Sequence, residues 1–144
     1  MARIEDLRLS DSGRKRRARM AVTGVVVFEE VDGARNEVEL RVSFFGQDGR
    51  DDHRLANNVT KIVRGQSDGE GEGDHSTWEV NAISPSRSEF LLVRENDNSI
   101  WTGRTFNEDK PGRDEVFARA VVRDSMSSEN LSEWARSNTV SGRY

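Results

Sequence analysis

Apolar and polar residues alternate strictly over residues 37–44. The apolar positions are Val38, Leu40, Val42 and Phe44, and every residue between them is Glu, Arg or Ser. Because successive side chains of a β-strand point to opposite faces, this period of two predicts a strand with one buried and one solvent-facing side. A half-buried antiparallel sheet needs a second apolar layer over its inner face, so the pattern also predicts a layered β fold.

Segments with a β-like pattern recur along the chain, separated by turns rich in Gly, Asn, Asp and Pro. Residues 20–31 are apolar on both faces around their middle, which indicates a central strand, and Gly24 within it indicates a bulge or a close approach of another segment. The other predicted strands are residues 59–63, 77–83, 90–93, 100–106 and 115–123. About seven or eight short strands predict an all-β fold, an antiparallel β-sandwich with a small barrel as the alternative.

The two ends of the chain differ from this body. Residues 1–19 are polar and end in a basic run, and their few apolar residues predict either a short edge strand or one helical turn. Near the other end, Leu131, Trp134 and Ala135 are at helical spacing, which predicts a short C-terminal helix. Ser127 or Ser128 would be its N-cap. The expected division is an N-terminal arm over 1–19, a β-sandwich over 20–124, and a helix and tail over 125–144.

Two loops are expected between the strands. Residues 46–58 are mostly polar, and residues 65–76 contain four glycines and no large apolar side chain. The glycine-rich segment has the composition of a mobile loop.

Composition narrows the class of protein. The chain has 144 residues, a formal net charge of −4 at pH 7, 33% hydrophobic residues and no cysteine. We therefore expect one domain without disulfides or thiolate metal sites, and the negative charge argues against nucleic acid as a partner. There is no transmembrane segment of about 20 apolar residues and no apolar signal region, so we expect a soluble protein, cytoplasmic or part of a larger assembly.

Acidic residues are concentrated between the predicted strands. If two such loops converge at one end of a sandwich, their oxygens would suit Ca²⁺, which takes six to eight oxygen ligands. Asp and Asn also dominate turns for conformational reasons, and Arg50 and Arg113 within two of the loops count against a cation site. The candidate calcium ligands are Asp48, Asp51, Asp52, Asp97 and Asp109.

Catalytic chemistry has little support in the sequence. Cysteine, the Gly-x-Ser-x-Gly elbow, the phosphate-binding P-loop and the dinucleotide fingerprint are all missing. His53 and His75 follow aspartates in polar loops, where solvent-exposed histidines are expected. Since the chain has 26 acidic residues, paired carboxylates will occur by chance, so a carboxylate-based hydrolase is only a second alternative. We assign no catalytic residue and no cofactor other than the alternative Ca²⁺.

Partner contacts are expected at the termini and on the sheet surface. Phe44 and Phe45 are consecutive, so Phe45 lies on the polar face unless a bulge intervenes. The candidate partner-binding residues are Arg14, Arg16, Arg17, Arg19, Phe45 and Trp134. The favoured function is a non-catalytic binding or assembly module that acts through loops, sheet edges and termini. Its partner is expected to be a protein, which includes a second copy of the same chain. The first alternative is a Ca²⁺-binding sandwich that recognises a membrane, a carbohydrate or a protein through its acidic loops.

Overall fold

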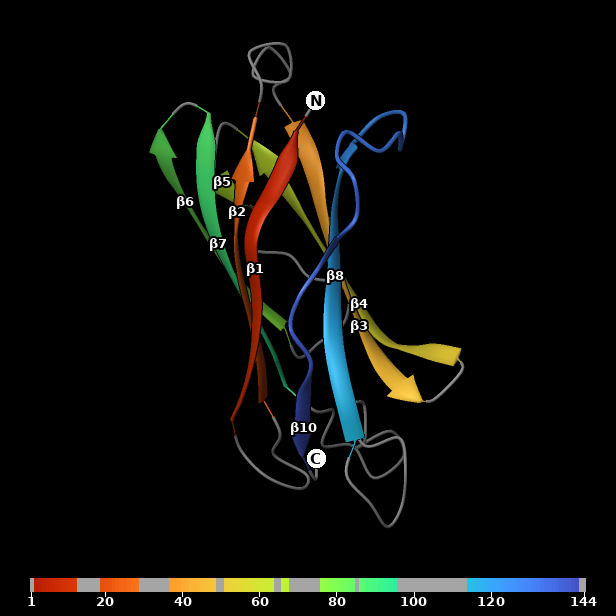
Figure 1. Cartoon of the computed structure of the whole chain (residues 1–144). Helices are drawn as coiled ribbons and strands as arrows, with labels where there is room; N and C mark the ends of the chain where they lie inside the picture. Colours follow the sequence, from red (N-terminus) through yellow and green to blue (C-terminus); the bar gives the residue numbers. More distant parts are fainter. Residues whose placement is uncertain are drawn as a thin grey trace.

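The computed structural model describes residues 2–12, 19–28, 37–48, 51–63, 66–67, 76–84, 86–95 and 114–142. Within these residues the protein is an antiparallel β-sandwich of two facing sheets, as the sequence predicts (Figure 1). The strands are β1 (Arg3–Ser12), β2 (Arg19–Val27), β3 (Glu37–Asp48), β4 (Asp51–Val63), β5 (Gln66–Ser67), β6 (Ser76–Ser84), β7 (Arg87–Glu95), β8 (Asp114–Asp124), β9 (Ala135–Arg136) and β10 (Val140–Gly142).

The sheets differ in size. The first has four strands in the order β1-β2-β7-β6. The second has the order β10-β8-β3-β4-β5, and the short β9 also pairs with β8. The predicted strand over 100–106 lies outside the described residues, as does most of the glycine-rich segment.

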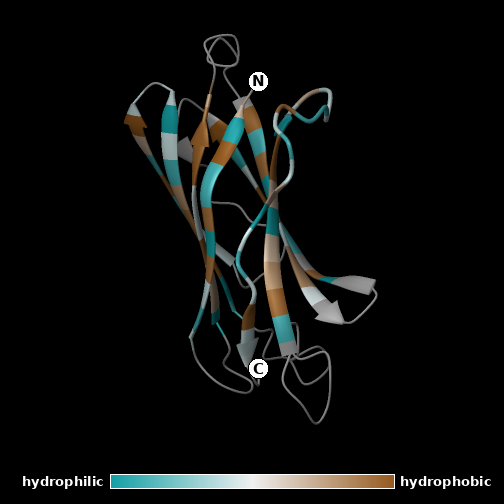
Figure 2. Ribbon diagram, viewed as in Figure 1, coloured by the Kyte–Doolittle hydropathy of each residue, from teal (hydrophilic) through white to brown (hydrophobic). Residues whose placement is uncertain are grey.

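The alternating run of β3 lines the core as its pattern predicts. Leu40, Val42 and Phe44 have no exposed surface, and Val38 is only 3% exposed. Large apolar residues of the first sheet close the other side of the core, among them Met20, Val22, Val26, Phe90 and Leu92. Figure 2 shows the resulting alternation of hydrophobic and hydrophilic positions along the strands.

The N-terminal strand keeps its apolar residues on the core side by means of a bulge. Ile4, Leu7 and Leu9 are spaced three and then two residues apart, which a regular strand would place on different faces. The register between β1 and β2 shifts between Glu5 and Arg8, and Asp6 there has a φ of 54°. Asp tolerates this left-handed conformation better than most residues. The extra residue brings all three apolar side chains against the core, which confirms the edge strand rather than the helical turn.

Gly24 allows the two central strands of the first sheet to pack closely. The register between β2 and β7 is unbroken, and Gly24 is paired with Phe90. A Cβ atom on Gly24 would lie 2.7 Å from two carbons of the Phe90 ring. The ring itself packs against Trp78 at 6.3 Å between centroids. The predicted close approach is therefore confirmed, without a bulge in β2.

The expectation of a polar loop over residues 46–58 is wrong. β3 continues to Asp48, β4 begins at Asp51, and the two strands pair along this whole stretch. Hydrogen bonds of the backbone stabilise a hairpin whatever its side chains are, so polar residues do not prevent the strand from extending. The hairpin tip projects from the body of the sandwich (Figure 1).

The expectation of a C-terminal helix is also wrong. After β8 the chain turns at Asp124, whose carboxylate accepts a hydrogen bond from the Met126 N–H at 2.8 Å. It then returns along β8 as an interrupted strand. Two of its serines bond to β8 through the side chain as well as the backbone: the N–H groups of Val122 and Ala118 donate to the Ser132 and Ser137 hydroxyls at 2.9 and 2.8 Å, and the Ser137 N–H donates to the Ala118 carbonyl at 2.9 Å. These bonds to β8 favour extended backbone over the helix that the apolar spacing suggested.

The returning segment also joins the two sheets along one side. The Asn138 side chain accepts a hydrogen bond from the Leu9 N–H at 2.8 Å and donates to the Leu9 carbonyl at 2.9 Å. The Ala2 N–H donates to the Leu131 carbonyl at 2.8 Å. The sandwich is therefore closed on the side where β1 lies beside the C-terminal segment (Figure 1).

Candidate functional site

The outer face of the second sheet carries a cluster of arginine and aromatic side chains. We call it the arginine–aromatic face and define it by Phe45 on β3, Phe117, Arg119 and Arg123 on β8, Trp134, and Arg136 on β9. Phe45 is paired with Phe117, and Arg119 with Arg136. Residues that are paired across antiparallel strands share one face, so the register brings these side chains together.

Phe45 owes its place to the position of a bulge. The pairing between β3 and β4 shifts after Phe44, because Phe44 is opposite Ala56 and Phe45 is opposite Arg54. The extra residue is therefore Leu55 of β4, which packs against the core. The pairing between β3 and β8 has no shift, so Phe45 stays on the outer face while Phe44 stays in the core.

Phe117 is the centre of the cluster. Its side chain is completely buried although it is on the outer face. The Phe45 ring is stacked against it at 5.5 Å between centroids and an interplanar angle of 15°. The Arg136 guanidinium lies 3.8 Å from the Phe117 centroid, and the Arg119 guanidinium lies 5.4 and 5.8 Å from the centroids of Phe45 and Phe117. Both guanidinium groups are therefore held over aromatic rings by cation–π contacts.

Neither of these two arginines is neutralised. Within the described part of the chain, Arg119 and Arg136 have no hydrogen bond to a side chain and no ion pair with a carboxylate. Like charges directly opposite each other in a sheet are destabilising. The fold thus holds two adjacent positive charges together, with no carboxylate of the described ranges between them.

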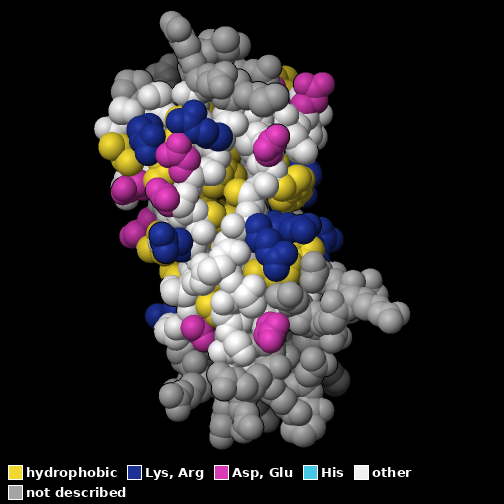
Figure 3. Space-filling view, viewed as in Figure 1, with side chains coloured by type: hydrophobic (Ala, Val, Ile, Leu, Met, Phe, Trp, Pro, Cys, Tyr) yellow, Lys and Arg dark blue, Asp and Glu magenta, His cyan; other side chains and the backbone are white. Residues whose placement is uncertain are grey.

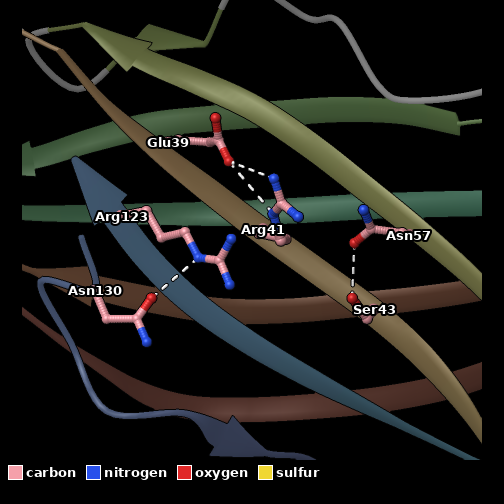
Figure 4. Close-up of polar contacts among 6 residues, drawn as sticks. All are labelled: Glu39, Arg41, Ser43, Asn57, Arg123 and Asn130. Carbon is pink, nitrogen blue, oxygen red and sulfur yellow. Dashed lines mark hydrogen bonds and ion pairs between the residues drawn. The ribbon is translucent and has the colours of Figure 1, made fainter. Parts of the chain in front are cut away.

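The neighbouring polar groups of the same face satisfy one another. The Arg41 guanidinium donates to the Glu39 carboxylate at 3.0 Å, and the Ser43 hydroxyl donates to Asn57 Oδ1 at 2.7 Å (Figure 4). Arg123 Nε donates to Asn130 Oδ1 at 3.0 Å. Within the described residues, Arg41 is thus the arginine of this face with a carboxylate partner, whereas the bond to the neutral Asn130 amide leaves the charge of Arg123 uncompensated, like those of Arg119 and Arg136.

Trp134 borders the cluster. Its side chain remains 45% exposed, and the Arg123 guanidinium lies 5.7 Å from its ring centroid. It is thus an exposed aromatic next to an ordered cation, although the helix expected to carry it does not form.

The face is positive in a protein of negative net charge. By register, the outward positions of β3, β4, β8 and β9 hold the cations Arg41, Arg54, Lys61, Arg119, Arg123 and Arg136 and the carboxylates Glu37, Glu39, Asp52 and Glu115. Figure 3 shows Lys and Arg side chains next to hydrophobic atoms over the middle of β8.

The first sheet carries a different feature on its own outer face. A shallow hollow of about 590 Å³ crosses its four strands. Partly buried Val25 and Leu91 line the hollow, together with Asp6, Glu79, Glu89 and Arg8. None of these four charged residues has an ion pair within the described residues.

The candidate site residues from the sequence are distributed unevenly. Phe45 and Trp134 belong to the arginine–aromatic face, whereas Arg19 lies on the first sheet, where its Nε donates to Glu95 at 3.1 Å. Asp48, Asp51 and Asp52 lie at the tip of the β3–β4 hairpin, where Asp48 is paired with Asp51. The remaining candidates lie outside the described residues: Asp97, Asp109, Arg14, Arg16 and Arg17. Within the described residues, no three His, Asp or Glu side chains gather as a metal site would require.

Sequence reasoning missed the centre of the face. Phe117, Arg119 and Arg136 were not candidates, because Phe117 and Arg119 look like ordinary alternation on β8 and Arg136 lies in the expected helix. The sequence did contain one signal: Phe117, Arg119 and Arg123 are separated by two and four residues, so they share the polar face of one predicted strand.

Comparison with known proteins adds no assignment. No protein-family model matches the sequence, and no curated protein matches it. In the part of the chain that the structure describes, no helix has the length and apolar character needed to span a membrane.

Proposed function

We propose that the protein is a non-catalytic binding module that docks an acidic protein segment on its arginine–aromatic face. The observation that carries this proposal is the pair Arg119 and Arg136, which are held opposite each other over Phe117 and have no carboxylate partner among the residues that the structure describes.

The chemistry of the pair suits carboxylates. A guanidinium presents five donors in a planar fork and binds a carboxylate through two parallel hydrogen bonds. Both groups lie over aromatic rings, and a carboxylate ligand would meet the N–H donors that they carry. Preorganised side chains lose little conformational freedom on binding, which favours affinity.

The surroundings support a protein partner. Arginine and tryptophan are enriched among the residues that dominate protein interfaces, and Trp134 supplies exposed apolar surface beside the charges. A partner with carboxylates next to an apolar residue would meet both features. The calcium-binding and hydrolase alternatives remain predictions, with no observation that favours them.

The proposal is tested by calorimetric titration with poly-L-glutamate at low ionic strength. The variant Arg136→Gln removes one unpaired charge from the face, and the matched control Arg8→Gln removes one unpaired, exposed charge from the opposite sheet. Hydrogen bonds to charged groups are worth about 1.5–3 kcal/mol, so Arg136→Gln should weaken binding by about tenfold or more. Arg8→Gln should change it by less than about twofold, which is the scale of a distant, screened charge.

Equal losses in the two variants would mean that only net charge matters, and they would overturn the proposal. Tighter binding of a single-stranded oligonucleotide than of poly-L-glutamate would also overturn it, because the partner would then belong to another class.

A further inference from the structure

The hollow on the first sheet has the opposite character to the arginine–aromatic face. We call it the acidic hollow and define it by Asp6, Glu79 and Glu89 around Val25 and Leu91. Arg8 is the one cation among the residues that line it. Its three carboxylates have no ion pair within the described part of the chain.

The register explains how the carboxylates come to surround an apolar floor. Glu79 of β6 is paired with Leu91 of β7, and Glu89 of β7 is paired with Val25 of β2. Asp6 is the extra residue of the β1 bulge on the other side of the hollow. The carboxylates therefore come from three strands and share the outer face with two apolar side chains.

This arrangement suits an arginine side chain. The aliphatic stem of arginine packs on apolar surface, while its guanidinium requires acceptors that a carboxylate provides. Carboxylates on several strands around a hollow can accept more than one such group.

We propose that the occupant of the acidic hollow is the Arg119–Arg136 pair of a second copy of this chain. The inference rests on the proposed function and names the partner: the acidic segment that docks on the arginine–aromatic face is the first sheet of another molecule. The support is charge complementarity. One outer face of the sandwich has unpaired cations, the other has unpaired carboxylates, and both have apolar surface beside the charges.

The placement of the two surfaces determines the kind of assembly. They lie on opposite outer faces of one sandwich, so a contact between them is heterologous. Each molecule in such a contact keeps one surface free, and further copies add head to tail until a ring closes or a filament grows. A symmetric dimer, which would use the same patch twice, is not expected.

Sedimentation velocity at low salt tests the inference by charge reversal. The wild type should form species larger than a dimer as its concentration rises. Arg119→Glu/Arg136→Glu and Glu79→Arg/Glu89→Arg should each remain monomeric, because each variant has lost one of the two surfaces. A mixture of the two variants still contains one intact arginine–aromatic face and one intact acidic hollow, so association should return in the mixture.

A second pair of variants guards against misfolding. Arg119→Gln/Arg136→Gln and Glu79→Gln/Glu89→Gln remove the charges without reversing them. Each variant should need at least about tenfold higher protein concentration than the wild type to associate to the same extent. Circular dichroism of each variant checks that it keeps its β structure.

The outcomes separate this inference from the proposed function. A wild type that is monomeric at every concentration, or mixed charge-reversal variants that stay monomeric, would overturn the inference. If poly-L-glutamate binding still depends on Arg136 in that case, the proposed function stands and the acidic partner is another protein. If poly-L-glutamate binding does not depend on Arg136 either, both the inference and the proposed function are wrong.

Discussion

Arg119 and Arg136 lie directly opposite each other in the pairing of β8 and β9, and both guanidinium groups lie over the ring of Phe117. Repulsion between two such charges opposes folding, whereas the contacts with the ring favour it. These two contributions oppose each other, so we expect the pair to have a small net effect on the free energy of unfolding.

This balance predicts a small effect of removing one charge. Arg136→Met keeps an apolar side chain over Phe117 and removes the repulsion, so the free energy of unfolding should change by less than about 1 kcal/mol in urea titrations. Phe117→Ala provides the contrast, because truncating a buried phenylalanine costs about 3–5 kcal/mol. A loss of more than 2 kcal/mol in Arg136→Met would show that the arginine is chiefly structural.

The contact between Gly24 and Phe90 predicts a steric effect. Gly24→Ala should lower the free energy of unfolding by about 1–3 kcal/mol, since the new methyl group meets a ring that Trp78 holds in place. The double variant Gly24→Ala/Phe90→Leu should lose at least about 0.5 kcal/mol less unfolding free energy than the sum of the two single variants, because the two residues are in contact. Strict additivity in this double-mutant cycle would contradict the packing.

The serine bonds of the C-terminal segment predict a cost in buried hydrogen bonding. Ser137→Ala leaves the Ala118 N–H without its acceptor in a buried position and should cost about 1–3 kcal/mol in the free energy of unfolding. The exposed Ser10 on β1 supplies the control, and Ser10→Ala should change stability by less than about 0.5 kcal/mol. Similar small effects at both serines would show that the segment does not depend on this bond.

Glu5 predicts a pH effect across the first sheet. The hydrogen bond from Arg3 at 2.7 Å, with a further one from Arg87 of β7 at 3.2 Å, lowers the pKa of the Glu5 carboxyl from its ordinary 4.5. A carboxyl whose pKa is lower in the folded state than in the unfolded state stabilises the fold at pH values above its unfolded-state pKa. That stabilisation is lost as the pH falls through its folded-state pKa. Glu5→Gln should therefore lower the melting temperature at neutral pH and have no effect well below pH 4.5. An equal effect at both pH values would exclude the ion pairs as its cause.

Local pattern was sufficient for the sandwich and for much of its core. The alternation around Val42 and the glycine at position 24 both report directly on strands and their packing. The hairpin at residues 46–58 was missed because backbone pairing leaves little trace in polar side chains. The helix at Leu131 and Trp134 was predicted from local spacing and a capping serine, whereas Ser132 and Ser137 bond to β8 across 10 and 19 residues of sequence.

The candidate site depends still more on long-range register. Phe45 was recognised from its position next to Phe44, but its partner Phe117 could be identified only from the pairing of β3 and β8. The opposition of Arg119 and Arg136 likewise follows from an edge pairing that no local signal marks.

The most direct test of the docking surface observes these arginines themselves. In an NMR titration with poly-L-glutamate, the Nε–Hε resonances of Arg119 and Arg136 should shift together and saturate with the same affinity, while that of Arg8 should stay in place. Shifts at Arg8 with unchanged resonances at Arg119 and Arg136 would contradict a docking site on the arginine–aromatic face.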